Sequence, residues 1–140
     1  MNFPRLGSAM FVFDKEGRIL LGQRNKEPHK GLWVVPGGKI LAFETIFDAA
    51  VREVFEETGL WVIPGGQLGT FELVNPPDEH RVIVYNWGWW VKGKLRPASD
   101  LSDAAFYPLP ECDSVAVTPF IRGVLGALLP DLKQISATRF

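Results

Sequence analysis

The alternation of apolar and polar residues along the chain predicts short strands on both sides of one strongly periodic helix. Strands are expected at residues 8–13, 18–23, 32–35, 61–63, 68–74, 81–92 and 104–107. Gly17 supplies the turn of a hairpin between the first two strands, and Pro64-Gly65-Gly66 predicts a second turn. Residues 75–80 are polar and are expected to form a loop.

The segment from Thr45 to Thr58 has the clearest helical pattern. Thr45, with Asp48 three residues later, resembles a capping box, and Gly59 is a natural C-terminal stop. A second helix is expected at residues 117–129, with Pro119 in its first turn. The first helix has an apolar stripe at helical spacing, which consists of Ile46, Phe47, Ala50, Val51, Val54 and Phe55.

This order of elements predicts an α/β (α+β) fold in which a mixed β-sheet lies between helices. At 140 residues, the chain is expected to form a single domain, residues 1–140. Within the strand at 81–92, the bulky side chains share one face, and these are Ile83, Tyr85, Trp87 and Trp89.

Composition and charge exclude several classes of protein. The formal net charge is −1, so we expect neither a nucleic acid nor an anionic membrane as partner. No apolar run is long enough to span a bilayer, and the first residues lack the apolar core of a signal peptide. Cys112 is the one cysteine, which excludes an intrachain disulfide. We therefore expect a cytoplasmic protein.

Acidic residues are concentrated on one face of the first predicted helix. Glu53, Glu56 and Glu57 are spaced three or four residues apart, so their side chains can converge. Like charges at this spacing destabilise a helix by roughly 0.2–0.5 kcal/mol per pair. A hard divalent cation such as Mg²⁺, Mn²⁺ or Ca²⁺ would relieve the repulsion.

Neighbouring residues fit such a cation. Glu44 precedes the helix, where its charge is favourable at the positive end of the dipole, and Arg52 lies close enough to orient a carboxylate. The backbone of Pro36-Gly37-Gly38 can approach a ligand closely, with carbonyl groups for a metal or N–H groups for phosphate. A glutamate-rich helix is more often a solvated face, but that interpretation predicts neither these glycines nor the arginine.

The segment from Gly38 to Leu60 resembles the Nudix box, Gly-x5-Glu-x7-Arg-Glu-U-x-Glu-Glu-x-Gly-U, in which U is a bulky aliphatic residue. Every fixed position is met, although Phe43 stands where many members of the family carry Gly. The resemblance implies the Nudix fold and hydrolysis of a nucleoside diphosphate linked to another moiety. It implies a small-molecule nucleotide substrate and Mg²⁺ as cofactor, with Mn²⁺ as a substitute.

The resemblance also implies roles for individual residues. Arg52 and Glu44 would orient the metal ligands. The general base would be a glutamate of the cluster, Glu53 or Glu56, or an acid from a later loop. The metal ligands themselves would be Glu53, Glu56, Glu57 and the carbonyl oxygen of Gly37.

The later base and the substrate contacts are less clearly marked. Asp100 is the first candidate for the base, since it lies a few residues before the strand at 104–107. Gly38 and Trp33 are expected to contact the substrate, Trp33 by stacking on a base. Aromatic residues on alternate strand positions more often pack in a core or a dimer interface, and a homodimer through residues 81–92 stays open. The alternative base candidates are Glu72, Asp78, Glu79 and Asp103.

The sequence leaves the substrate and two other functional classes open. Pro76 is the sixteenth residue after Leu60 (76 − 60 = 16), which resembles the ADP-ribose pyrophosphatase pattern. Nucleoside triphosphate hydrolases of the MutT type are an equal alternative, and nucleotide sugars stay open. The protein could instead be a catalytically silent Nudix-fold regulator that binds a nucleotide. It could also be an interaction protein whose acidic helix binds a basic partner or Ca²⁺.

Overall fold

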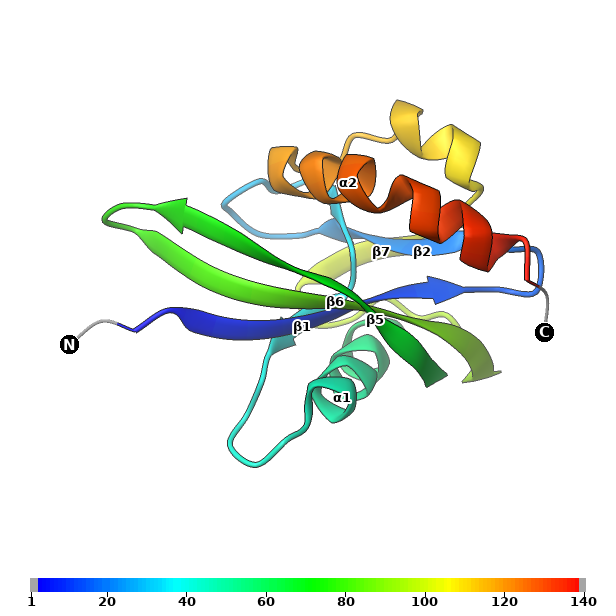
Figure 1. Ribbon diagram of the computed structural model, residues 1–140, viewed down its shortest axis with the longest axis horizontal. Coiled ribbons are helices and arrows are strands. Elements are labelled where there is room, and N and C mark those ends of the chain that lie inside the picture. Colours follow the sequence, from blue (N-terminus) through cyan, green and yellow to red (C-terminus); the bar gives the residue numbers. More distant parts are fainter. Residues whose placement is uncertain (1–2, 139–140) are drawn as a thin grey trace.

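The computed structural model describes residues 3–138, in which helices cover both faces of a sheet (Figure 1). The helices are α1 (Ile46–Thr58), α2 (Pro119–Ser136) and a short 3-10 helix, η1 (Leu109–Ser114). The strands are β1 (Arg5–Phe13), β2 (Ile19–Arg24), β3 (Trp33–Val34), β4 (Gly37–Lys39), β5 (Leu60–Asn75), β6 (Glu79–Gly93) and β7 (Leu101–Tyr107).

The sheet is mixed because parallel and antiparallel pairings meet at β1. Strand β1 runs parallel to β6, with Arg5 beside Arg81 and Phe13 beside Trp89, and antiparallel to β4. The other edge of β6 pairs with β5 in a long antiparallel hairpin. The order through the sheet is β3-β2-β1-β6-β5, with β7 beside β2. The predicted α/β fold, a mixed sheet between helices, is confirmed.

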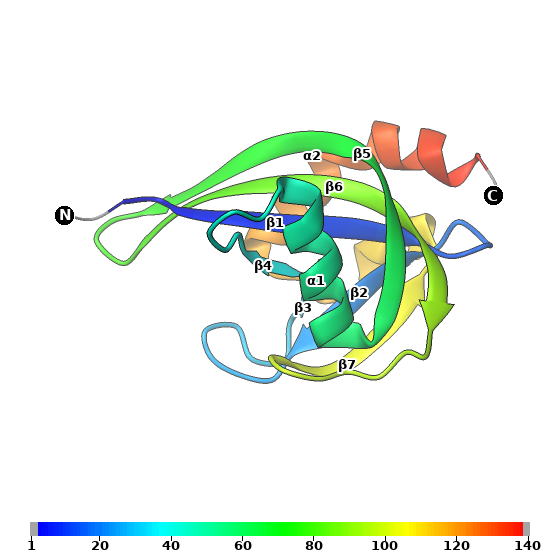
Figure 2. The same ribbon diagram turned by 90° about the horizontal axis from the view of Figure 1, so that it is seen from below.

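Alternate side chains of β1 divide the hydrophobic core between the two faces of the sheet, as the period of a strand requires. Met10 and Val12 pack with Val54 under α1. Phe11 and Phe13 belong to the larger cluster, which α2 covers. Figures 1 and 2 show α1 and α2 on opposite faces of the sheet.

Helix α1 begins and ends where the sequence predicts. The Thr45 hydroxyl accepts a hydrogen bond from the Asp48 N–H at 3.0 Å, which caps the first turn. Gly59 has a left-handed conformation, with φ of 77°, and ends the helix. The Ser8 hydroxyl donates to the Ile46 carbonyl at 2.6 Å, so the first turn of α1 is tied to β1.

The turn predicted at Pro64-Gly65-Gly66 is wrong, because β5 continues through these residues. Register shifts beside Pro64 and Gly66 let the strand bend without ending. The ring of Trp87 on β6 lies against these glycines, and a Cβ on Gly65 would come within 2.3 Å of it. The glycines therefore make room for a cross-strand tryptophan.

Other boundaries also differ from the prediction. Helix α2 continues past residue 129, through Pro130 to Ser136, and the fully buried Leu132 holds this last part on the core. The predicted hairpin of residues 8–13 and 18–23 pairs only next to its turn, where Phe13 lies beside Ile19, and β2 then pairs with β7. The short elements β4 and η1 have no counterpart in the prediction.

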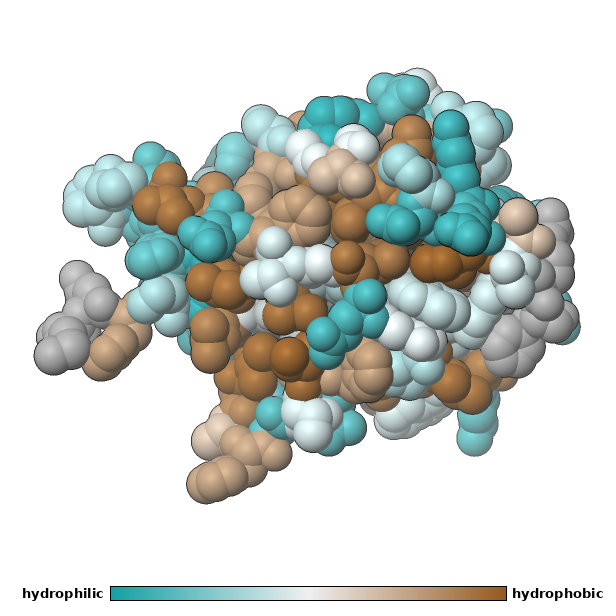
Figure 3. Space-filling view, in the orientation of Figure 1, coloured by the Kyte–Doolittle hydropathy of each residue, from teal (hydrophilic) through white to brown (hydrophobic). Residues whose placement is uncertain are grey.

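The arrangement of β6 and the surface bear on the expected partners. Strand β6 pairs with β1 over residues 81–89 and with β5 over residues 79–93, so both edges of residues 81–89 are occupied within the chain. A homodimer through residues 81–92 stays a prediction. Figure 3 shows brown apolar patches between teal polar regions on one face. No helix within residues 3–138 is both long and apolar enough to cross a membrane.

Candidate active site

Strand β4 and the acidic side of α1 meet at two glycines. A Cβ on Gly38 would come within 2.5 Å of the Glu53 carboxyl carbon, so this carboxylate lies directly against the glycine. A Cβ on Gly37 would come within 2.5 Å of the Ala9 Cβ on β1. Gly37 faces the backbone of Ala9 and Ser8, which cannot move aside, so this position requires glycine for packing, whereas a side chain at Gly38 would displace the Glu53 carboxylate. These glycines bring the backbone of β4 into contact with the glutamates.

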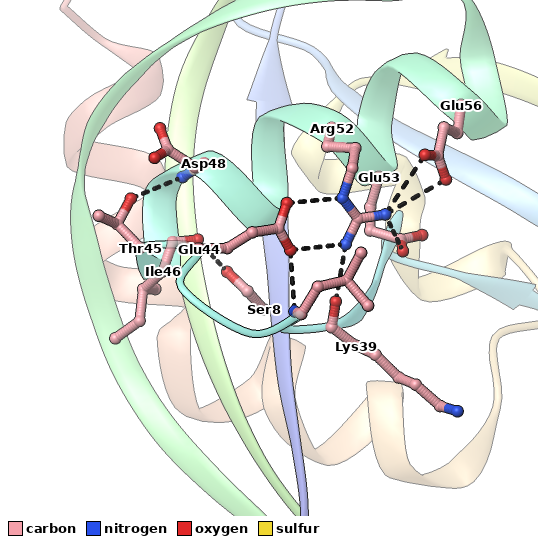
Figure 4. A network of polar contacts seen from close by, with 10 residues as sticks. Ser8, Lys39, Glu44, Thr45, Ile46, Asp48, Arg52, Glu53 and Glu56 are labelled. Atoms are coloured by element: carbon pink, nitrogen blue, oxygen red, sulfur yellow. Dashed lines mark hydrogen bonds and ion pairs between the residues drawn. The ribbon is translucent and has the colours of Figure 1, made fainter.

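Arg52 lies at the centre of a network of polar contacts (Figure 4). Its Nε and Nη2 donate to the two oxygens of Glu44 at 2.7 and 2.9 Å, which is a bidentate ion pair. Its Nη1 donates to Glu53 at 2.8 Å and to both oxygens of Glu56 at 3.3 Å. Its Nη2 also donates to the Lys39 carbonyl at 2.9 Å. One guanidinium thus joins β4, the loop before α1 and the helix itself.

The contacts of Arg52 fix the charge of Glu44. The guanidinium, together with the Leu41 N–H at 2.8 Å, lowers the pKa of the Glu44 carboxyl below its ordinary value. The same ion pair raises the pKa of Arg52. Arg52 contacts Glu53 and Glu56 directly, whereas Glu44 reaches them through Arg52.

Glu57 is in a different environment from its neighbours. It is 8% exposed and accepts a hydrogen bond from the Gly37 N–H at 2.9 Å. Burial raises the pKa of Glu57 to about 8, and the charges of Glu53, Asp100 and Glu56 add to the rise, while the Gly37 bond opposes it. A buried carboxylate with negative neighbours is costly unless a cation compensates its charge. The environment of Glu57 therefore favours a bound cation.

The donors at this site fit a hard divalent cation, although they are not gathered around one point. Within residues 3–138, no group of three His, Cys, Asp or Glu side chains converges closely enough to hold a metal as it lies. The donors are nevertheless carboxylate oxygens, which Mg²⁺ and Mn²⁺ prefer. One of them, Glu57, is buried and has no ion pair within the part of the chain that the structure describes. The Gly37 group that faces Glu57 is its N–H, so a role for its carbonyl oxygen stays a prediction.

Of the predicted later-loop bases, Asp100 lies near the acidic face of α1. Its charge raises the pKa of Glu57, and its Oδ1 is 3.1 Å from Lys26 Nζ. Asp103 directs its own Oδ1 to the Ala104 N–H at 2.8 Å. The other candidates belong to the β5–β6 hairpin and its turn, and they are Glu72, Asp78 and Glu79.

Trp33 is half-buried and held at both its backbone and its ring. Its N–H donates to the Ala116 carbonyl at 2.9 Å, and its ring makes an edge-on contact with Tyr107 at a centroid distance of 5.5 Å. Tyr85 and Trp89 are buried in the core, as the packing interpretation of the aromatic stripe predicts. A substrate contact of Trp33 stays a prediction.

The sequence marks Phe43 only as a departure from the usual Gly of the box, and the structure adds that it is fully exposed and has a φ of 68°. Sequence reasoning missed the residues that contact the loop of Asp100. Asn25 and Lys26 contact the segment that carries Asp100, but nothing in their polar loop distinguishes them in the sequence.

A family model and several known proteins match parts of this sequence. The model of the NUDIX domain matches residues 3–125. The low-salt glycan biosynthesis protein Agl8 of Haloferax volcanii is 46% identical over 56 residues, which are 40% of this chain and 35% of that protein. An ADP-ribose pyrophosphatase of Methanocaldococcus jannaschii is 43% identical over 47 residues, 34% of this chain and 28% of that protein. The match thus spans about a third of each relative's length.

Solved structures share the fold over most of the chain. A MutT NUDIX hydrolase from Burkholderia pseudomallei has a TM-score of 0.79 and 26% identity, and the match covers 89% of this chain and 98% of that one. The NUDIX domain of Shewanella oneidensis NrtR, solved with ADP ribose, has a TM-score of 0.77 and 20% identity, over 94% and 90% of the two chains.

A third structure contains a metal. It is a bifunctional NMN adenylyltransferase/ADP ribose pyrophosphatase from Francisella tularensis, complexed with AMP and a Mn ion. Its TM-score is 0.72 at 20% identity, over 94% of this chain and 43% of that one, so the likeness shows the fold alone. The family model, by contrast, spans most of the sequence, and this chain belongs to the Nudix hydrolase family.

Proposed function

We propose that this protein is a Mg²⁺-dependent hydrolase that cuts the diphosphate linkage of a nucleoside diphosphate derivative and releases a nucleoside monophosphate. The observation that carries the proposal is the buried Glu57, on which the negative charges of Glu53 and Glu56 act and which has no ion pair with a basic side chain among the described residues. A solvated acidic face would leave Glu57 exposed, whereas it is 8% exposed. Nudix hydrolases typically depend on a divalent metal.

The chain's own residues have distinct roles in this proposal. Glu53, Glu56 and Glu57 hold the cation, and Gly37 supports Glu57 through its N–H. Arg52 and Glu44 limit the rotamers of Glu53 and Glu56, so fewer conformations are lost when these carboxylates bind. A bound Mg²⁺, or Mn²⁺ in its place, would neutralise the diphosphate and lower the pKa of a bound water.

A carboxylate is also needed to accept a proton from the attacking water. Asp100 is our first choice, because its charge acts on Glu57 and it lies beside the acidic face of α1. Glu53 and Glu56 are the alternatives, although both already accept hydrogen bonds from Arg52. Gly38 and Trp33 are proposed to contact the substrate.

The substrate class is a small nucleotide in which a diphosphate links a nucleoside to another moiety. ADP-ribose is supported by the related pyrophosphatase of Methanocaldococcus jannaschii, and nucleoside triphosphates by the similar MutT hydrolase of Burkholderia pseudomallei. A panel of ADP-ribose, nucleotide sugars, dinucleoside polyphosphates and nucleoside triphosphates, each with Mg²⁺ and identification of the products, tests the proposal. We expect a nucleoside monophosphate from at least one of them.

The second candidate is a catalytically silent regulator that binds a nucleotide. The NUDIX domain of Shewanella oneidensis NrtR, which was solved with ADP ribose, has the same fold. A silent regulator would bind one of the panel compounds and return it unchanged. An intact set of Glu53, Glu56 and Glu57 favours the hydrolase, since binding a nucleotide alone does not require all three acids.

A further inference from the structure

The loop that carries Asp100 is held on both sides. The Ala98 N–H donates to the Glu57 carbonyl at 2.9 Å, which ties the loop to the last turn of α1. On the other side, Asn25 donates its backbone N–H to the Asp100 carbonyl at 2.9 Å and its Nδ2 to the Ser99 carbonyl at 3.0 Å. Between these contacts Ser99 has a φ of 56°, a conformation that serine rarely adopts.

The side chain of Asp100 has its own partner. Lys26 Nζ lies 3.1 Å from Asp100 Oδ1, with the two side chains 59% and 48% exposed. An isolated pair this exposed contributes about 0–1 kcal/mol. Here the bonds from Asn25 have already fixed the backbone of Asp100, so less conformational entropy is lost when Lys26 pairs with it.

We propose that Asn25 and Lys26 are positioning residues that hold the Asp100 carboxylate beside the acidic face of α1. The inference rests on the proposed function, since it assigns a purpose to the contact only if that face binds a cation. Within the described residues, neither Asn25 nor Lys26 forms a hydrogen bond or ion pair with Glu53, Glu56 or Glu57. Both act through Asp100, Asn25 on its backbone and Lys26 on its carboxylate.

The binding of Mn²⁺ alone to the whole chain, measured by electron paramagnetic resonance, distinguishes a positioning role of Lys26 from a direct effect of its charge on the cation. Asp100→Asn removes a negative charge near the site and should weaken Mn²⁺ binding. Lys26→Met removes a positive charge, so a pure charge effect would tighten binding. If Lys26 positions Asp100, K26M instead weakens binding roughly threefold to tenfold, which lies in the lower part of the range of coupling between residues in contact.

The double variant K26M/D100N completes a double-mutant cycle for the pair Lys26 and Asp100. In the D100N background Lys26 has no carboxylate to position, so adding K26M should leave Mn²⁺ binding unchanged or tighten it.

Three further variants test the roles of the individual residues. Lys26→Arg, which retains the charge, should bind Mn²⁺ nearly as well as the unaltered protein. Asn25→Ala should act in the same direction as K26M, because it removes the donor to the Ser99 carbonyl. Lys30→Met is the matched control, a lysine of the same exposed loop, and should resemble the unaltered protein.

Turnover gives a second readout. On a substrate from the panel, K26M should lower kcat and leave KM within about twofold, because the substrate contacts are retained. Tighter Mn²⁺ binding in K26M, equal in both backgrounds, would overturn the positioning role and leave the proposed function intact. Absence of Mn²⁺ binding and of turnover in the unaltered protein would overturn the proposed function and this inference with it.

Discussion

At the scale of single residues, the chain holds unfavourable conformations close to the acidic helix face. Phe43 has a left-handed backbone and a fully exposed side chain, so no packing offsets the strain. It directly precedes Glu44, whose carboxylate holds both Arg52 and the Leu41 N–H. The contacts of Glu44 therefore fix the loop that contains Phe43.

Replacing Phe43 with glycine should stabilise the protein. Glycine adopts a φ of 68° without the Cβ clash, and the gain should be about 0.5–1 kcal/mol after the entropy cost of glycine is subtracted. Urea unfolding measures this difference. Phe43→Ala is the control, because it removes the ring but keeps the Cβ, and it should give no comparable gain. Equal stability of the two variants would show that the backbone is not strained.

Glu57 should make the stability of the metal-free protein depend on pH. Its folded pKa of about 8 lies above the ordinary 4.5, so its favourable contribution is present below pH 4.5 and is lost as the pH rises through 8. In EDTA, the free energy of unfolding should fall by up to about 3–5 kcal/mol over this range. Glu57→Gln should lack this part of the pH dependence.

Thermal unfolding in EDTA at pH 5 and pH 8.5 tests this difference between the unaltered protein and E57Q. Other groups titrate in both proteins, so the comparison isolates Glu57. Asp131→Asn, at an exposed position of α2, should keep the pH dependence of the unaltered protein. Identical pH profiles for the unaltered protein and E57Q would contradict the burial of an uncompensated carboxylate.

At the scale of elements, α1 is fixed by local contacts at its first turn. The Thr45 hydroxyl satisfies the Asp48 N–H, which would otherwise have no partner in the helix. Thr45→Ala should lower the free energy of unfolding by about 1 kcal/mol. Urea unfolding should also show that Thr45→Ser, which keeps the hydroxyl, loses less than half as much. An alanine variant as stable as the serine variant would contradict this role of the cap.

Such local signals explain which elements could be predicted from the sequence. The cap at Thr45 and the stop at Gly59 are encoded within a few residues of α1, and its bounds follow from them. The course of β5 through Pro64-Gly65-Gly66 depends on Trp87, which is distant in sequence. The extension of α2 past Pro130 likewise depends on burial of Leu132 in the core. Long-range packing therefore determines the course of β5 and the end of α2, which local sequence patterns do not predict.

The same distinction holds within the candidate site. The four-residue spacing of Arg52 and Glu56 within one helix gives their contact directly, whereas the contact of Arg52 with the adjacent Glu53 does not follow from helical spacing. The burial of Glu57 and the contact of its carboxylate with Gly37 arise only when β4 packs against α1. The pairing of Lys26 with Asp100 joins two loops through the β2–β7 ladder, and no local pattern marks it.

At the scale of the whole molecule, the larger hydrophobic cluster and the acidic residues of the candidate site lie on opposite faces of the sheet. The larger hydrophobic cluster lies on the α2 side, while α1 and β4 lie on the other side (Figure 2). There Glu53 and Glu57 of α1 contact the glycines of β4. Hydrogen bonds of Arg52 join the loop before α1, the helix and β4. The fold thus holds charged groups close together that would repel one another in a free helix.

The most direct test of this account is the rate of diphosphate cleavage in Mg²⁺ for the unaltered protein, E57Q and D131N. The measurement uses the panel substrate that gives a nucleoside monophosphate. We predict that E57Q loses about 100-fold or more in kcat/KM, because a ligand of the cation is lost. D131N should retain full activity. An E57Q variant that cleaves as fast as the unaltered protein would contradict the central role of the buried glutamate.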